Sequence, residues 1–364
     1  MNTVKKLPLA MAVVAALCPI SVMAQEFTQE QIDAIVAKAV DKALADRQAK
    51  IDAAANKKVD VITNPETTAA SPDMAIPFGL KFSGYARYGA HFQTGDQKYV
   101  GVDGSYNGAS AIGRLGNESN GGEFQISKAF KSAQGAIWDL NVMFDHWSDE
   151  VNLKKAYVGV TNVLESNPNA YLWAGRDFHQ RPQQGINDYF WAWQGGLVLS
   201  HTNDSGVNKV ILRYSDNSDN SVYNKTDDLT TVYASFEGSH KFTQQAQVEY
   251  LLAFHDYDNG KDNTDNRKNY GAIVRPMYFW NDVHSTWLEA GYQRVDYDQG
   301  GDNHGWKLTL SQNIAIGMGP EFRPMLRFYV TGGQVDNEHT AKVNGTQDQQ
   351  LDSLNVGGMF EAWF

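Results

Sequence analysis

Hydrophobic and polar residues alternate along much of the chain after residue 78, which is the pattern of β-strands with one apolar face. Residues 82–92, 137–146 and 354–364 show it well. Their apolar faces carry Phe82, Ala86, Tyr88, Ala90, Phe92, Trp138, Leu140, Val142, Phe144, Leu354, Val356 and Phe360. The opposite faces carry Ser83, Tyr85, Arg87, Gly89, His91, Asp139, Asn141, Asp145, Asn355, Glu361 and Trp363. The pattern predicts strands throughout this region.

The predicted strands are about ten residues long, and loops rich in Asp, Asn and Gly separate them, as at residues 216–228 and 256–269. Transmembrane barrels combine these two features. A soluble β-sandwich also alternates, but large aromatics on the apolar faces favour a barrel, which needs them at both membrane interfaces. We count about 15 or 16 such segments, and bacterial barrels close with even strand numbers. We therefore expect an all-β fold, a transmembrane antiparallel β-barrel of 16 or 18 strands over residues 78–364, enclosing an aqueous channel.

The first 24 residues have the pattern of a secretory signal peptide. Lys5 and Lys6 precede an apolar run at residues 7–22, and the small residue Ala24 ends the segment before Gln25. A membrane anchor is the alternative, but a spanning helix needs roughly 20 continuous apolar residues, which is longer than this run. The only cysteine, Cys18, lies in the signal segment, so we expect no internal disulfide in the mature chain.

Residues 25–62 predict a helix. One face carries apolar residues at helical spacing, and Thr28 with Gln31 fits a capping box. The stripe consists of Ile32, Ile35, Val36, Ala39, Val40, Ala43 and Leu44. A single helix cannot bury such a stripe, so we expect a periplasmic coiled coil with copies of itself; a loosely helical, solvated arm is the alternative. Residues 63–77, rich in Pro, Thr, Ser and Ala, predict an extended linker.

Composition narrows the function. Aromatic residues make up 12% of the chain and there are 32 glycines, which suits strands and turns. The formal charge of −11 excludes a nucleic-acid partner, which requires a basic surface.

Sequence motifs of catalysis are missing. The chain has no Gly-x-Ser-x-Gly elbow, no His-Glu-x-x-His helix and no phosphate-binding glycine loop, and its nine histidines lack metal-ligand spacing. Asp256, Asp258 and Asp262 loosely resemble a calcium loop, but no acidic residue closes the loop at the expected spacing, so we interpret it as a solvated surface loop. We expect a protein that is not an enzyme and has no cofactor.

The polar faces of the first and last strands suggest a path for a ligand. These strands become neighbours when a barrel closes, which would place Tyr85, Arg87 and Trp363 together on the inner wall. Aromatic rings can stack on the apolar face of a sugar, and an arginine can donate hydrogen bonds to its hydroxyls. The alternative is that these side chains simply fill the lumen.

Several strings resemble the maltoporin family of sugar-specific porins, which includes the sucrose porins. They occur in the family's order and cover nearly the whole predicted barrel. They are Phe82-Ser-Gly-Tyr85-Ala-Arg87, Arg114-Leu-Gly-Asn-Glu118, Trp173-Ala-Gly-Arg-Asp-Phe-His-Gln-Arg181, Asp188-Tyr-Phe190, Val274-Arg-Pro-Met-Tyr278, Glu289-Ala-Gly-Tyr292, Lys307-Leu-Thr-Leu310, Arg323-Pro-Met-Leu-Arg327 and Glu361-Ala-Trp363-Phe364. The helical segment ahead of the barrel is similar to the N-terminal extension of sucrose porins.

The resemblance implies a homotrimer in which each subunit has its own channel, with a lumen slide of aromatic residues flanked by charged ones. The aromatic positions that it implies are Tyr85, Trp363, Tyr233, Trp147 and, where maltoporins have a constriction tyrosine, Phe190. The charged track that it implies comprises Arg87, Arg114, Glu123, Lys154, Arg181 and Asp188. Two slide aromatics of the family are replaced here, one by Gly121 or Gly122 and one by Glu321.

Taken together, these features predict a carbohydrate-selective porin of the bacterial outer membrane, in contact with its lipid, that lets sugars or oligosaccharides diffuse passively. A general diffusion porin with little sugar selectivity is the alternative. Two other classes are an outer-membrane phospholipase, which needs a Ser–His pair that spacing does not reveal, and an envelope tether, suggested only by residues 26–61.

Overall fold

The computed structural model describes residues 79–147, 150–177, 183–190, 196–219, 225–346 and 350–363. The predicted signal peptide, helical segment and linker at residues 1–77 lie outside the described residues. Residues 76–364 form one compact unit. The described residues contain no helix long and apolar enough to cross a membrane.

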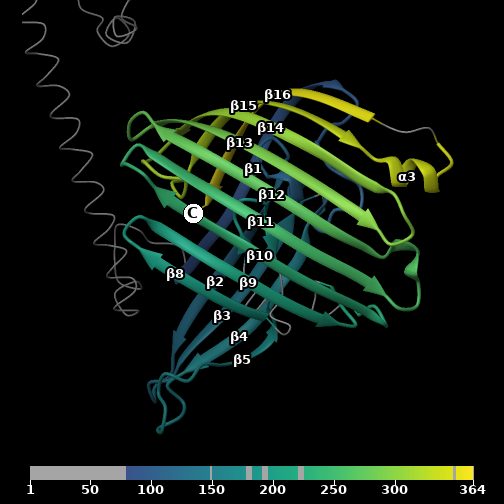
Figure 1. Ribbon diagram of the computed structural model, residues 1–364. Coiled ribbons are helices and arrows are strands. Elements are labelled where there is room, and N and C mark those ends of the chain that lie inside the picture. Colours follow the sequence, from purple (N-terminus) through teal and green to yellow (C-terminus); the bar gives the residue numbers. More distant parts are fainter. Residues whose placement is uncertain are drawn as a thin grey trace, which may run out of the picture. The chain divides into compact units, whose positions relative to one another are not determined.

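One large antiparallel sheet dominates this unit (Figure 1). Its strands are β1 (Leu80–Gly95), β2 (Gly121–Lys131), β3 (Ile137–His146), β4 (Asn152–Thr161), β5 (Leu172–Arg176), β8 (Gly196–Asn203), β9 (Gly206–Asp216), β10 (Leu229–Lys241), β11 (Ala246–Asn259), β12 (Arg267–Phe279), β13 (His284–Tyr297), β14 (Asp302–Ala315), β15 (Met325–Asp336) and β16 (Gln350–Trp363). The smaller elements are η4 (Gly108–Ile112), β6 (Gln183–Gln184), β7 (Tyr189–Phe190), η5 (Asn263–Asp265) and α3 (Glu338–Val343).

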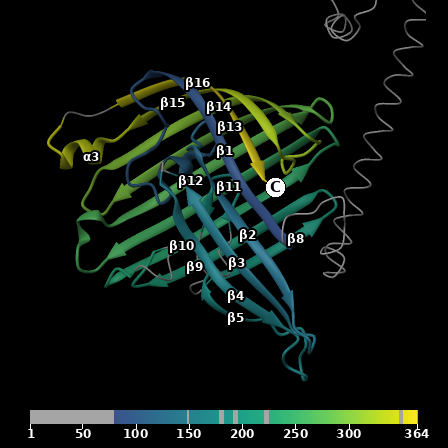
Figure 2. The same ribbon diagram turned by 180° about the vertical axis from the view of Figure 1, so that it is seen from behind.

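The first and last strands are neighbours, as the sequence predicts. The order across the sheet runs from β5 to β1, continues directly to β16 and then descends to β8. β1 and β16 are antiparallel, with Tyr85 opposite Trp363 and Arg87 opposite Glu361. Strands β2–β5 lie behind β9–β12 in Figure 1 and in front of them in the reverse view of Figure 2, so the sheet curves round on itself. Among the described pairings, β5 and β8 are the outermost strands.

The predicted strand number of 16 or 18 is wrong for the described residues, whose main sheet has 14 strands. Two parts of the barrel sequence fold inward instead of extending the sheet. Residues 98–120, here called the inner segment, contain only the short helix η4, and residues 183–190, the inner hairpin, pair only with each other through β6 and β7. Their apolar side chains, such as Val100, Val102 and Ile112, are buried inside the curve of the sheet. In a strand of the barrel, such side chains would face the lipid instead.

The two faces of the sheet differ as the alternation predicts. Phe328, Leu310 and Val356 are more than half exposed on the outer face. Their sequence neighbours Arg327, Thr309 and Asn355 are at most 1% exposed on the inner face. Apolar side chains on the outside and charged ones within are the arrangement of a membrane barrel with a polar interior.

The two edges of the sheet also differ. One edge is closed by short turns at residues 132–136, 204–205, 242–245 and 280–283 and by two longer connections at residues 162–171 and 316–324, and we call this the turn end. Longer segments close the other edge, the loop end, including residues 96–120 and 217–228. Bacterial barrels have short periplasmic turns and longer extracellular loops, which assigns the two ends.

The inner segment packs against strands β12–β15. Val100, Val102 and Ile112 form a core with Val295 and Val335, all of them at most 3% exposed. Burying side chains of this size contributes roughly 1.5–3 kcal/mol each. The contact is close enough that a Cβ on Gly291 would lie 1.8 Å from the carbonyl oxygen of Ile112, so only glycine fits there. The inner segment is therefore part of the folded wall.

Candidate functional site

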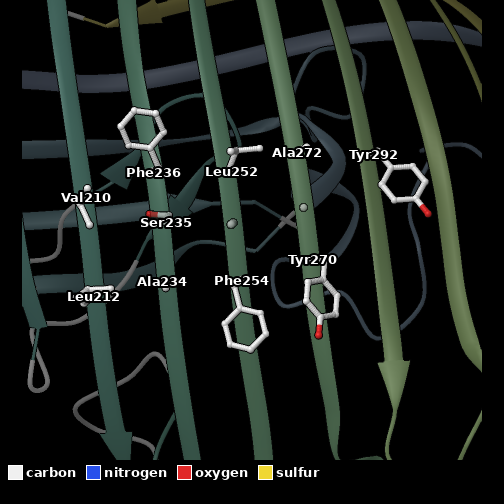
Figure 3. A pocket seen from close by; sticks show the side chains of 12 residues that line it. Val210, Leu212, Ala234, Ser235, Phe236, Leu252, Phe254, Tyr270, Ala272 and Tyr292 are labelled. Carbon is white, nitrogen blue, oxygen red and sulfur yellow. The ribbon is translucent and has the colours of Figure 1, made fainter.

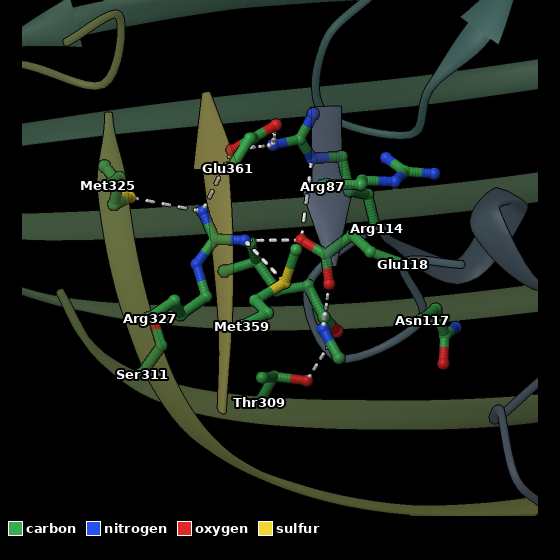
Figure 4. A network of polar contacts seen from close by, with 12 residues as sticks. Arg87, Arg114, Asn117, Glu118, Thr309, Ser311, Met325, Arg327, Met359 and Glu361 are labelled. Carbon is green, nitrogen blue, oxygen red and sulfur yellow. Dashed lines mark hydrogen bonds and ion pairs between the residues drawn. The ribbon is translucent and has the colours of Figure 1, made fainter. Parts of the chain in front are cut away.

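Glu361, near the end of β16, is the centre of a buried charged network (Figure 4). Arg114 of the inner segment donates to both carboxylate oxygens of Glu361, at 2.7 and 2.9 Å. The Arg323 side chain donates through Nε to Oε2 at 2.7 Å, and the Tyr85 hydroxyl donates to Oε1 at 2.8 Å. Glu361 is only 2% exposed, so these partners replace the water that it has lost.

Asp188 of the inner hairpin bridges the two arginines of the track. It accepts from Arg87 of β1 and from Arg114, the latter at 3.1 Å. Burial by itself would raise the pKa of Asp188, but the facing Arg114 and Arg87 outweigh it and hold the pKa below its ordinary value of 3.8. Asp188 has a φ of 53°, a left-handed conformation that Asp tolerates better than most residues. The pairing thus joins both inward segments to β1.

Beside this network three aromatic rings follow one another on the inner face. Tyr85 lies between Trp147 and Trp363, and its ring centroid is 6.1 Å from each of theirs. The Arg87 guanidinium lies 5.1 Å from the Trp147 ring, and that of Arg323 lies 4.5 Å from the Trp363 ring. The row therefore has a cation over each of its outer rings.

Trp147 occupies the space that Gly121 leaves. A Cβ on Gly121 would lie 2.4 Å from Cε3 of Trp147, and Gly121 has a φ of 151°. The absence of a side chain at Gly121 thus leaves room for an aromatic ring from the loop after β3.

The remaining predicted site residues are distributed around this centre. Glu123 lies opposite Tyr85 in the β1–β2 register. Lys154 pairs with Asp145 at 2.8 Å. Phe190 lies in β7, two residues after Asp188. Arg181 lies outside the described residues.

Tyr233 does not line an open path. It is fully buried against Tyr106 and Tyr189, and its hydroxyl donates to Gln184 at 2.6 Å. The expectation that it belongs to the aromatic row does not fit this placement.

A second charged network holds the inner segment. Lys307 donates to the backbone oxygens of Gly113 and Leu115, each at 2.6 Å, and to Glu289 at 2.9 Å. Arg275 pairs with Glu289 at 2.5 Å and donates to the backbone oxygen of Ile186 in the inner hairpin at 2.9 Å. Both inward segments are thus anchored to strands β12–β14.

Sequence reasoning missed Glu361, Arg323, Glu118 and Arg327 as site residues. Glu118 pairs with Arg327, and both side chains are almost fully buried. All four belong to strings that resemble the family, but those strings do not show which residues contact one another. The apolar Val100, Val102 and Ile112 are the sequence signal of the inner segment, but they are equally compatible with a strand.

An apolar groove of about 410 Å³ lies away from these networks, on the outer face of β9–β13 (Figure 3). Phe236, Leu252, Phe254 and Tyr270 line it around Ala234 and Ala272. Its lining has the composition of a surface that faces lipid hydrocarbon. Among the described residues no group of three or more His, Cys, Asp or Glu side chains is placed to hold a metal ion.

The sequence of the chain matches a known protein family. The profile of the LamB porin family matches residues 80–197 and 192–364. The chain belongs to the LamB porin family. This LamB porin is 22% identical to the maltoporin of Hahella chejuensis, in an alignment that covers 78% of the chain and 92% of the relative.

Two solved structures resemble this LamB porin more distantly. The trimer form of OmpT, an outer membrane protein of Vibrio cholerae, has 11% identity and a TM-score of 0.47, covering 78% of this chain and 99% of that one. An anion-selective porin from Comamonas acidovorans has 10% identity and a TM-score of 0.35, with the same coverage. These scores are low, so the assignment rests on the family match and the strand pairing. This LamB porin is accordingly a β-barrel of the bacterial outer membrane.

Proposed function

We propose that this LamB porin is a carbohydrate-selective channel through which sugars or oligosaccharides diffuse passively. The observation that carries the proposal is the row of Trp147, Tyr85 and Trp363 beside the Arg87–Asp188–Arg114 cluster. Ring faces suit the apolar side of a sugar, and charged groups beside them suit its hydroxyls. The 22% identity to a protein named maltoporin supports the same substrate class.

Transport through such a path requires no covalent step and no cofactor. Binding must be weak and repeated along the path, because a single deep site would hold the sugar rather than release it. The polar track of the proposal consists of Arg87, Arg114, Glu123, Lys154, Arg181 and Asp188, and Phe190 adds an aromatic at the constriction.

Sugar block of the ion current tests the proposal. The purified porin is inserted into a planar bilayer, and the current is recorded while glucose, sucrose or maltotriose is added. A carbohydrate-selective channel shows saturable block by at least one of them. If none of the three sugars reduces the current at any concentration tested, the general diffusion porin is favoured.

We further propose a homotrimer, with residues 25–62 forming a periplasmic coiled coil between subunits. The apolar stripe of that segment supports this proposal, because a single helix cannot bury it. Deleting residues 26–61 tests it: a trimer that dissociates more readily on heating is expected, whereas an unchanged trimer with lost envelope attachment would make the segment a tether.

A further inference from the structure

A second cluster of aromatic and polar side chains lies on the inner face of β3–β5, toward the turn end. Asp139 of β3 is opposite Gly159 of β4, which is opposite Trp173 of β5. These positions share the inner face with Asn141, which is 6% exposed, while the adjacent Leu140 and Trp138 are exposed on the outer face. The cluster is separate from the row at Tyr85, which lies on β1.

The cluster is built around Tyr171, the residue just before β5. Its hydroxyl donates to Asp139 at 3.0 Å. A Cβ on Gly159 would lie 1.9 Å from that hydroxyl, so the tyrosine lies across the glycine on the inner wall. Tyr157 and Trp173 pack edge to face beside it, with ring centroids 5.9 Å apart. The space left by Gly159 and the hydrogen bond to Asp139 thus fix the position of the Tyr171 ring.

The rings of Trp173 and Tyr171 remain accessible from the lumen. Trp173 is 37% exposed and Tyr171 is 41% exposed, although both belong to the inner face or its border. An exposed ring next to a carboxylate offers an apolar surface and a hydrogen-bond acceptor within one contact area. Those are the two features that a sugar ring can use together.

A chain of hydrogen bonds links this cluster to the level of the constriction. Gln125, two residues after Glu123 on β2, donates to Ser127 at 3.0 Å. Ser127 donates to Asn141 at 2.7 Å, and Asn141 donates to Asp139. A continuous series of hydrogen bonds therefore runs along the inner wall from Gln125 to Asp139 at the turn end.

We propose that Trp173, Tyr171 and Asp139 form a second carbohydrate subsite at the turn end of the channel. The site takes a hexose ring by stacking on Trp173 or Tyr171 while Asp139 accepts from its hydroxyls. It rests on the proposed function, since only a channel that carries sugars has use for it. Because the turn end is periplasmic in bacterial barrels, the site is met last by an incoming sugar.

Side-specific sugar block tests the subsite in oriented single channels. Sucrose or maltotriose is added to one side at a time, and association and dissociation rates are taken from the block events. In Trp173→Ala, block by sugar added at the turn side should associate roughly threefold to tenfold more slowly, the range of one aromatic contact. Association from the loop side should stay as in the unmodified porin.

A matched control removes another tryptophan of the same wall. Trp138 of β3 is 42% exposed, close to the value for Trp173, but lies on the outer face. Trp138→Ala should leave both association rates unchanged, and Trp173→Phe should restore most of the turn-side rate. Gly159→Ala should act like Trp173→Ala, because it displaces Tyr171 without removing a ring.

The outcomes separate the two proposals. If the unmodified porin shows no sugar block from either side, the proposed function fails and the subsite with it. If the unmodified porin is blocked, and Trp173→Ala and Gly159→Ala both insert as stable channels with unchanged turn-side rates, the subsite alone is refuted.

Discussion

Arg114 and Glu361 are 247 residues apart in the chain, yet Arg114 donates to both carboxylate oxygens of Glu361. One residue comes from a segment folded into the barrel and the other from its last strand. The same glutamate also binds Arg323 and Tyr85, so the carboxylate sets the position of an aromatic and a cation at the proposed sugar path. Charge pairing thus holds the inward segments to the barrel wall.

Replacing Glu361 should destabilise the barrel. Glu361→Gln leaves Arg114 and Arg323 buried with less compensation, and breaking a buried pair of this kind costs roughly 3 kcal/mol or more. We expect a lower temperature for heat-induced unfolding, followed by gel mobility or circular dichroism. Glu338→Gln removes the same charge from an exposed position on α3 and should leave the transition in place. Equal stability of the two variants would contradict the buried network.

The aromatic row should contribute to sugar affinity. Tyr85→Ala and Trp363→Ala should each weaken sugar block by about 1 kcal/mol, or roughly fivefold in the blocking constant, if stacking resembles other aromatic contacts. Phe82→Ala removes a ring from the opposite face of β1, where it is 53% exposed, and serves as the control. Unchanged block in both test variants would place the sugar path elsewhere.

Gly121 should be required for the position of Trp147. In Gly121→Ala the new Cβ would lie 2.4 Å from the Trp147 ring and 2.6 Å from the carbonyl oxygen of His146, so Trp147 and the backbone before it must shift. Sugar block should then weaken toward the value of Trp147→Ala. Gly332→Ala is the control, because a Cβ there has no neighbour closer than 3.9 Å. Full block in Gly121→Ala would mean that Trp147 does not take part.

The charge of Asp188 should set ion selectivity. Asp188→Asn leaves the positive charges of Arg87 and Arg114 without their shared carboxylate, which attracts anions into the constriction. The reversal potential in a salt gradient should shift toward the anion potential. Asp296→Asn, which removes a carboxylate paired with the half-exposed Arg294, should cause little shift. A reversal potential that shifts toward the cation potential in Asp188→Asn would contradict this role of Asp188.

Acid should loosen the same contact. The pKa of Asp188 is depressed in the folded protein, so the stability from its ion pairs is fully present above pH 3.8. That stability is lost as the pH falls below this value through the folded-state pKa. We therefore expect single-channel conductance to become noisier below pH 3.8, as the inner hairpin loses one anchor. In Asp188→Asn the increase in conductance noise at low pH should be absent. If the increase persists in this variant, protonation of another group causes it.

The strands and their faces were predictable because alternation is local. Leu140 beside Asn141, and Phe360 beside Glu361, reveal inside and outside without knowledge of the fold. The adjacency of Tyr85 and Trp363 followed from barrel closure. The strand number did not, because the inner segment and the inner hairpin have apolar residues that count as strand-like until their burial is seen.

The charged centre was harder to predict. Arg114 came from the resemblance, but its partner Glu361 depends on a contact across 247 residues, which no local pattern contains. Tyr233 shows the opposite failure: an aromatic on the inner face was expected to be accessible, yet Tyr106 and Tyr189 cover it. Facing the lumen is a local property, whereas being exposed there depends on which loops fold inward.

Sugar-dependent block of the current through single channels of the unmodified porin tests most directly whether the channel selects carbohydrates. A carbohydrate-selective channel should show saturable block by at least one of glucose, sucrose and maltotriose, with a blocking constant that Tyr85→Ala and Trp363→Ala weaken. An ion current that none of these sugars reduces, through channels of normal conductance, would contradict carbohydrate selectivity.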